Sequence, residues 1–80
     1  MTFVEKYHIA DNWHDKVLIM SLFHTVMSSS DDSWTLSKTA KEFEVSIGLV
    51  SENLKLALAI DKNPKLLKIE TRQDALKKLK

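Results

Sequence analysis

The chain has 80 residues, of which 44% are hydrophobic and 29% are charged, and its formal net charge is +1. A chain of this length supports one hydrophobic core, which excludes a second domain. It contains no cysteine, so disulfides and zinc fingers are excluded as well. One Gly and one Pro, beside abundant Leu, Lys, Glu and Ala, predict a single small all-α domain.

Residues 1–11 are predicted to form an N-terminal arm ahead of the first helix. The alternation of Phe3, Glu5, Tyr7 and Ile9 is compatible with a short extended segment. A frayed coil or an arm that docks on a partner fits the same residues, because terminal segments are ordered only when something holds them.

A core helix is predicted over residues 12–28, with Asn12 as its cap and Asp15 as an acid in its first turn. Most of its circumference is apolar, so we expect it to be buried against the next helices or to form half of a dimer interface. Its two apolar stripes consist of Trp13, Val17, Met20, His24 and Met27, and of Ile19, Leu22, Phe23 and Val26. Residues 28–33 are predicted to be a polar loop, over which Trp34 closes the core.

Residues 36–61 are predicted to form two helices joined by a tight corner. Leu36, Ala40 and Phe43 share one face of the first helix, which Thr35 can cap, and Ser46 can cap the second. Small Ala40 suits the point where the two helices cross most closely. The matching stripe on the second helix consists of Val50, Leu54, Ala57 and Leu58.

This spacing resembles the helix-turn-helix of phage Cro and repressor proteins: Ala40, a turn four positions later, and aliphatic Val50 ten positions after the alanine. The run from Val50 to Ala57, Val-Ser-Glu-Asn-Leu-Lys-Leu-Ala, is similar to the recognition helix of ParB-type partition proteins. The resemblance covers roughly a third of the chain. It departs from the usual pattern at Glu44, where glycine is typical and where positive φ would cost another residue about 1 kcal/mol.

Residues 62–80 are predicted to form basic C-terminal helices, which brings the expected number of helices to about five. Asn63 and Pro64 begin a short helical turn with Leu66, Leu67 and Ile69, and the last helix begins at Thr71 with inward Ala75, Leu76 and Leu79. This segment carries six lysines and one arginine against two acids, whereas residues 1–35 carry two lysines against five acids. The basic end could lie along a phosphate backbone, although a solvated lysine-rich face explains the same charges equally well.

The resemblance implies sequence-specific binding of double-stranded DNA, as a transcriptional regulator or as a protein that recognises a partition or phage DNA site. The residues expected to contact bases are Ser46, Ile47, Gly48, Ser51, Glu52 and Lys55, and those expected to contact phosphates are Thr35, Ser37, Lys38, Lys62 and Lys65. Short Ser46, Gly48 and Ser51 on an outward face favour this function, because a purely structural helix gains nothing from them. The alternative is a protein–protein assembly module that uses the apolar first helix, with the two later helices as a scaffold.

One recognition helix offers few base-reading groups, and Glu52 repels phosphate, so we expect a homodimer or a larger symmetric assembly. Phe3, Tyr7, Trp13 and Met20 exceed what a core of this size needs, which predicts an interface before Met27.

Other function classes find little support in the sequence. His14 and His24 are ten residues apart and no catalytic motif is present, so we expect no metal, cofactor, small-molecule substrate or enzymatic activity. The longest apolar run, Val17 to Met20, is too short to span a membrane, and no secretion signal is recognisable. We therefore expect a soluble, cytoplasmic protein.

Overall fold

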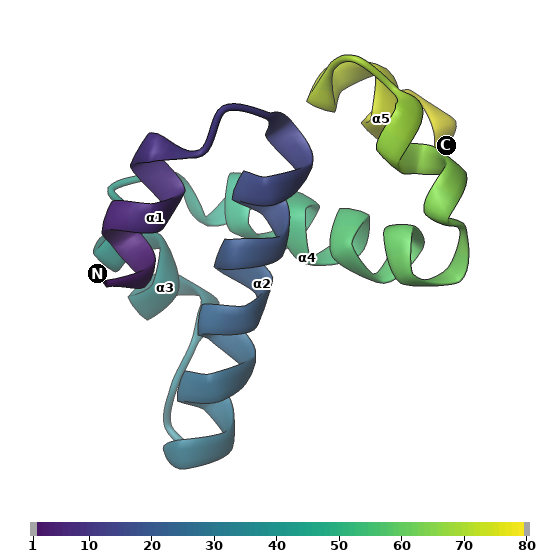
Figure 1. Cartoon of the computed structure of the whole chain (residues 1–80). Coiled ribbons are helices and arrows are strands. Elements are labelled where there is room, and N and C mark those ends of the chain that lie inside the picture. Colours follow the sequence, from purple (N-terminus) through teal and green to yellow (C-terminus); the bar gives the residue numbers. More distant parts are fainter. Residues whose placement is uncertain (1, 80) are drawn as a thin grey trace.

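The computed structural model describes residues 2–79, and its elements confirm the all-α prediction (Figure 1). Five α-helices and one 3-10 helix follow one another along this part of the chain: α1 (Phe3–Ile9), α2 (Trp13–Ser30), α3 (Leu36–Phe43), α4 (Ile47–Lys62), η1 (Pro64–Lys68) and α5 (Arg72–Lys78). The sequence also predicted five helices, but it included the turn at Pro64 among them and did not include α1.

Residues 3–9 are helical rather than extended. Thr2 and Glu5 form a capping box, in which the Glu5 N–H donates to Thr2 Oγ1 (3.1 Å) and the Thr2 N–H donates to Glu5 Oε1 (3.2 Å). Phe3 and Tyr7 are four residues apart, a spacing that puts them on one face of a helix as readily as of a strand. Both rings pack against the buried core residues of α2 and α3, so α1 is part of the packed domain rather than a free arm.

Helix α2 begins as predicted and ends later. Asn12 caps it by accepting a hydrogen bond from the Asp15 N–H (2.9 Å). The helix continues through Ser30, into the predicted polar loop, and Ser30 Oγ donates to the Val26 carbonyl (2.9 Å), which lets a serine remain in the last turn. Beyond it, the N–H and hydroxyl of Ser33 donate to Asp31 Oδ1, and these bonds lower the pKa of the Asp31 carboxyl.

The corner between α3 and α4 has the predicted form. Glu44 adopts the left-handed conformation (φ 57°, ψ 44°), its N–H donates to the Lys41 carbonyl (3.2 Å), and the Val45 N–H donates to the Ala40 carbonyl (3.0 Å). This pair of bonds is a Schellman motif, which ends α3 and turns the chain at once. Ser46 then caps α4 by accepting from the Leu49 N–H (3.1 Å), so only three residues separate α3 from α4.

Around this corner lies the first of two hydrophobic clusters, which we call the corner cluster. Its fully or almost fully buried members are Met20, Ala40, Phe43 and Val50. The rings of Tyr7 and Phe23 each stand edge-on to Phe43 with centroids 5.1 Å away, an arrangement that aromatic pairs prefer. Trp34 packs on Phe23 (6.0 Å), as expected for a side chain that closes the core over the loop.

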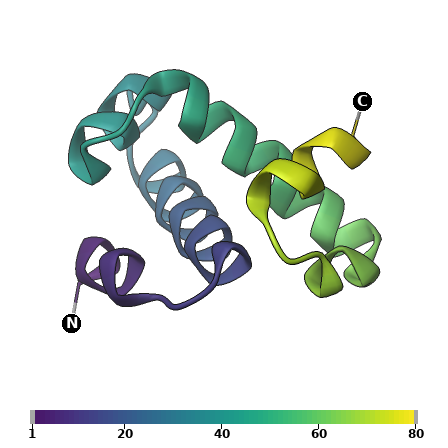
Figure 2. The same ribbon diagram turned by 90° about the horizontal axis from the view of Figure 1, so that it is seen from above.

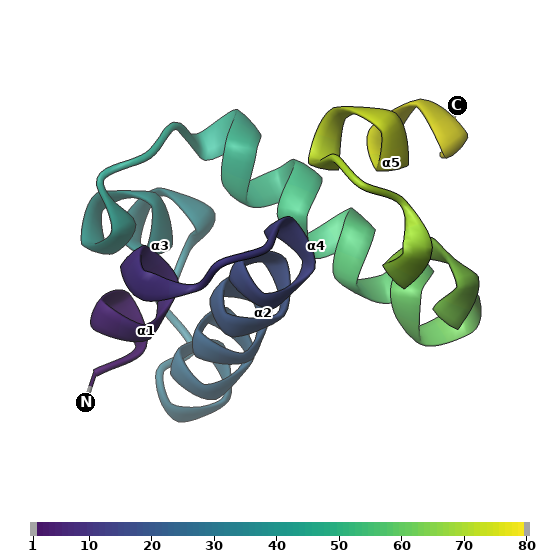
Figure 3. The ribbon, with the colours of Figure 1, turned by 45° about the horizontal axis from the view of Figure 1, so that its top comes forward.

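The second cluster, the tail cluster, joins α2 to the distal half of α4, η1 and α5. Its buried members are Val17, Leu56, Ala57, Ile60, Leu66 and Ala75. The predicted α4 stripe is correct for Val50 and Ala57 but wrong for Leu58, which is 65% exposed. Both α2 and η1 pack against α4 (Figures 2 and 3), and in its distal half the residues buried between them are Leu56, Ala57 and Ile60.

The C-terminal segment follows the predicted pattern. Pro64 opens η1, and Thr71 caps α5 by accepting from the Asp74 N–H (3.1 Å). Ala75 is buried as predicted, but Leu79, which was also predicted to face inward, is 41% exposed. In η1, Leu66 is buried and Leu67 is 40% exposed. The short α5 therefore covers the tail cluster with only a small apolar face.

Candidate nucleic-acid interface

Four of the predicted base-contacting residues lie together on the outward side of α4. Ile47, Gly48, Ser51 and Lys55 are spaced so that they follow one side of its first three turns. Ser51 is half-buried and the other three are exposed. Together with Ser46, which caps the helix, we call them the outward stripe.

Nothing in the packing or backbone of the described residues requires a glycine at position 48 of this stripe. A Cβ placed on it would meet only Ser46 Oγ, at 3.9 Å, which is ordinary van der Waals contact. Its φ is not positive, so the backbone does not require glycine either. A glycine inside a helix is less favourable than alanine by about 1 kcal/mol. The fold would therefore be more stable with alanine at this position.

Glu52, the remaining predicted base contact, lies at the edge of the stripe and is bound by an arginine from α5. Arg72 Nη2 donates to Glu52 Oε1 (3.0 Å), and Arg72 Nε donates to Asn53 Oδ1 (2.7 Å). The carboxylate of Glu52 is therefore neutralised locally, and the repulsion of phosphate that we expected from it is reduced. No spacing in the sequence connects Arg72 with a residue that precedes it by 20 positions.

The five predicted phosphate contacts fall in two places. Thr35, Ser37 and Lys38 are exposed at the start of α3, where backbone N–H groups point outward. Lys38 Nζ also lies 5.7 Å from the centre of the Trp34 ring. Lys62 and Lys65 are exposed too, but they belong to the far end of α4 and to η1. At 1.5 Å per residue, Lys62 is roughly 24 Å from Ser46 along the helix, so one short DNA contact does not engage both groups.

The side chains that we expected to hold a dimer together are used inside the monomer. Met20 is fully buried, Phe3 and Tyr7 pack on the corner cluster, and Trp13 packs on the tail cluster. The Trp13 Nε1–H also donates to the Ile69 carbonyl (2.7 Å). The core of the monomer therefore uses all four side chains. The prediction that they exceed what this core needs is wrong.

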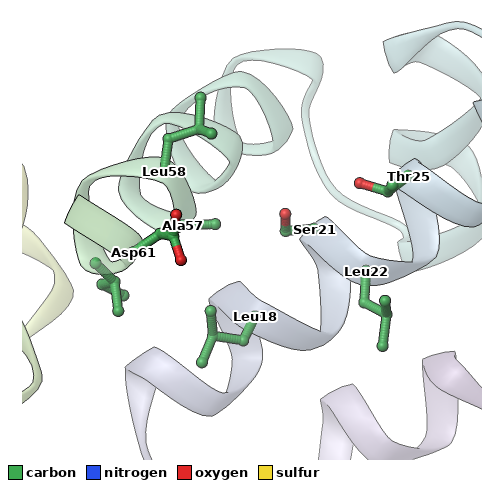
Figure 4. A pocket seen from close by; sticks show the side chains of 8 residues that line it. Leu18, Ser21, Leu22, Thr25, Ala57, Leu58 and Asp61 are labelled. Atoms are coloured by element: carbon green, nitrogen blue, oxygen red, sulfur yellow. The ribbon is translucent and has the colours of Figure 1, made fainter. Parts of the chain in front are cut away.

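Other apolar residues are exposed instead, around two grooves that share Leu18. One groove, of about 390 Å³, lies between α2 and α4, and Figure 4 shows its lining side chains, among them Leu18, Leu22 and Leu58. The other, of about 490 Å³, lies between α1 and α2 beside Ile9. We define the apolar patch as five exposed apolar residues of α1, α2 and the distal half of α4: Ile9 (62% exposed), Leu18 (40%), Leu22 (55%), Val26 (44%) and Leu58 (65%).

The histidines show no metal site. His24 Nδ1 lies 2.7 Å from Thr39 Oγ1, and Trp34 Nε1 donates to the same oxygen (2.8 Å), so one ring nitrogen of His24 has a hydrogen-bond partner. Within residues 2–79, no three His, Asp or Glu side chains come together in a way that could hold a metal ion. Over the same residues, no helix has the length and apolar character needed to cross a membrane.

Comparisons with protein-family models, with curated proteins and with solved structures find no match. The resemblance to Cro-type and ParB-type proteins therefore stays a prediction from the sequence.

Proposed function

We propose that this protein binds double-stranded DNA, with the outward stripe of α4 in the major groove. The observation that carries the proposal is the composition of that stripe. Ser46, Gly48 and Ser51 are short and outward, and Gly48 lowers helix stability without a packing or backbone reason. Short side chains let a helix backbone approach the base edges closely, which gives Gly48 a purpose that the fold does not.

The packing of α2, α3 and α4 supports this arrangement. In a helix-turn-helix, the second helix enters the major groove by its N-terminal residues while the first crosses the DNA backbone. Here the corner cluster fixes α3 and α4 on α2 from the inner side and leaves the outward stripe uncovered. The exposed start of α3 then offers the Ser37 hydroxyl and the Lys38 ammonium group to a phosphate. We infer a regulatory, partition or phage DNA-site role in the cytoplasm, without a cofactor.

Duplex binding at two salt concentrations tests this function. We expect a fluorescent random-sequence duplex to bind at about 50 mM salt and to bind far more weakly at about 200 mM, because phosphate contacts release counterions. Ser51→Glu and Lys55→Glu should each weaken binding at least tenfold, by introducing negative charge on the stripe. Lys68→Glu, which makes the same charge change as Lys55→Glu on exposed η1, is the matched control. Equal binding by Lys55→Glu and the parent would refute the assignment of the stripe.

We further propose that the DNA-binding form is a twofold homodimer joined by the apolar patch. Leu18, Leu22 and Val26 recur on one face of α2, and such a face can pack against its own copy in a symmetric dimer. Two copies would present two recognition helices, which need to be about 34 Å apart on DNA. Sedimentation at tens of micromolar should show a dimer for the parent and a monomer for Leu22→Glu.

The second candidate function is a protein-assembly module, and the same patch favours it. An exposed apolar surface across three helices marks an interaction site whether or not DNA is involved. A parent protein that forms dimers but binds no duplex at low salt would favour this function over DNA binding.

A further inference from the structure

We propose that Glu52 reads a cytosine in the major groove and that Arg72 is the positioning residue that holds its carboxylate in place. This inference rests on the proposed DNA binding by α4. It assigns to Arg72 a role that the sequence did not indicate, and it names the base that one position of the site should prefer.

The guanidinium of Arg72 is fixed at three points on α4. Its Nε donates to Asn53 Oδ1 (2.7 Å), and its Nη2 donates to Glu52 Oε1 (3.0 Å) and lies 3.5 Å from the Leu49 carbonyl oxygen. Asn53 is itself almost completely buried (1% exposed) and its Nδ2 contacts Met20 Sδ (3.2 Å) in the core. The arginine is therefore anchored through a buried amide, and its position does not depend on the exposed ion pair alone.

This anchoring gives Glu52 a defined orientation at the surface. The side chain of Arg72 is 20% exposed and that of Glu52 is 51% exposed, so the arginine reaches the carboxylate from the protein side. Arg72 occupies Oε1, and Oε2 has no hydrogen-bond partner among the described residues. An exposed ion pair between flexible side chains usually contributes little. A carboxylate held by a mostly buried guanidinium instead resembles the pre-organised groups that confer specificity.

The chemistry of the base edges selects cytosine. An ionised carboxylate only accepts hydrogen bonds. In the major groove, guanine presents two acceptors and thymine presents an acceptor and a methyl group, so both repel or fail to satisfy it. Adenine presents a donor beside the N7 acceptor, whereas cytosine presents its N4 amino donor alone. Cytosine N4 is therefore the favourable partner of Glu52 Oε2.

Selection of bound sequences from a random duplex library tests the base preference. We expect the parent to prefer cytosine at one position of the selected site by about tenfold over the other bases. Glu52→Gln replaces the carboxylate by an amide, which pairs with adenine N6 and N7, so the preference at that position should change from cytosine to adenine. Glu42→Gln removes one negative charge from exposed α3 and should leave the preference unchanged.

Arg72→Lys tests the positioning role. Lysine keeps the charge but lacks the planar fork that contacts Asn53 and Glu52 together. The cytosine preference should fall several-fold, while affinity for a random duplex stays within about twofold of the parent. A melting curve shows whether the variant is folded, and Glu52→Gln tests the base reading independently of α5.

The outcomes separate this inference from the proposed function. A parent that binds duplexes without a cytosine preference, or a Glu52→Gln variant that keeps the parent's preference, overturns the inference and leaves DNA binding by α4 intact. An Arg72→Lys variant that is folded and keeps the full preference overturns the positioning role. A parent that binds no duplex overturns both proposals.

Discussion

The two ends of α4 are fixed to the rest of the protein by different means. At the first end, the corner cluster surrounds Phe43 with aromatic rings and buries Ala40 and Val50, which are 4% and 0% exposed. At the other end, the buried members of the tail cluster are all aliphatic, and α5 contributes only Ala75 to them. Four long-range hydrogen bonds also hold the C-terminal segment. One runs from Trp13 to the Ile69 carbonyl, and three run from Arg72 to Asn53, Glu52 and the Leu49 carbonyl in the first half of α4.

The difference indicates how each end would fail. Close packing tolerates neither a charge nor a void, so damage at the corner should unfold the whole domain. Hydrogen bonds over a small apolar contact can break one at a time, so damage at the tail should release α5 and leave α2, α3 and α4 assembled. The proposed DNA-binding stripe is attached to the more firmly fixed end.

The largest effect is expected at the corner. Ala40→Glu and Val50→Asp each place a charge at a fully or almost fully buried position, which should cost several kcal/mol against a total stability of about 5 kcal/mol. Thermal melting followed by circular dichroism should show an unfolded or severely loosened domain. Lys41→Glu, a charge reversal on exposed α3, is the control and should melt close to the parent. Unchanged melting of both core variants would show that the corner is not closely packed.

A smaller effect is expected at the tail. Arg72→Ala removes the hydrogen bonds to Asn53 and Glu52 and leaves the buried Asn53 amide oxygen without that partner, which should cost about 1–3 kcal/mol. Hydrogen exchange should then quicken in α5 before it quickens in α2 or α4. If exchange quickens equally in all helices, the two ends are one cooperative unit and the comparison fails.

The hydrogen bond from Trp13 to the C-terminal segment is the next to test. Trp13→Phe keeps most of the ring but deletes the Nε1–H that donates to the Ile69 carbonyl, so we expect a loss of about 1–2 kcal/mol. Denaturant titration measures this loss of stability. In the double variant with Arg72→Ala, the two losses of stability should nearly add, because the two hydrogen bonds share no partner.

A stabilising change is expected in the turn. Glu44 has φ 57°, a conformation that glycine adopts without strain, so Glu44→Gly should raise stability by about 1 kcal/mol or less. A lower melting temperature for this variant would mean that the Glu44 side chain makes a favourable interaction that outweighs the backbone strain.

The smallest effect on stability is also the most informative about function. Gly48→Ala should stabilise α4 by about 0.5–1 kcal/mol, because the added methyl group meets only Ser46 Oγ at 3.9 Å. If the stripe contacts DNA, the same methyl group should weaken duplex binding. A variant that is more stable and binds DNA as well as the parent would remove the main support for the proposed interface.

Local signals made much of the fold predictable. Each cap side chain accepts a hydrogen bond from the backbone N–H three residues later, a spacing that is visible in the sequence. This holds for Asn12, Thr35, Ser46 and Thr71. Ala40 and Val50 were predictable because their spacing follows from helix geometry and a short turn. Helix α1 was missed because Phe3 and Tyr7 satisfy the periods of a helix and of a strand alike.

The parts that could not be predicted depend on contacts between distant segments. Arg72 reaches Glu52 only because η1 returns the chain along α4, and no local pattern encodes that path. The apolar patch was likewise hidden, because α2 is apolar around most of its circumference and the sequence alone does not say which side α1, α3 and α4 cover. Once they are placed, Leu18, Leu22 and Val26 remain outside.

The most direct test of the central proposal is to map the DNA contact by NMR, with ¹⁵N-labelled protein and a short duplex at low salt. We predict that the largest amide shifts fall at the start of α3, residues 35–38, and along the head of α4, residues 46–55. Shifts confined to the apolar patch around Leu18 and Leu22, or no shifts at all, would contradict the proposal that the outward stripe of α4 binds DNA.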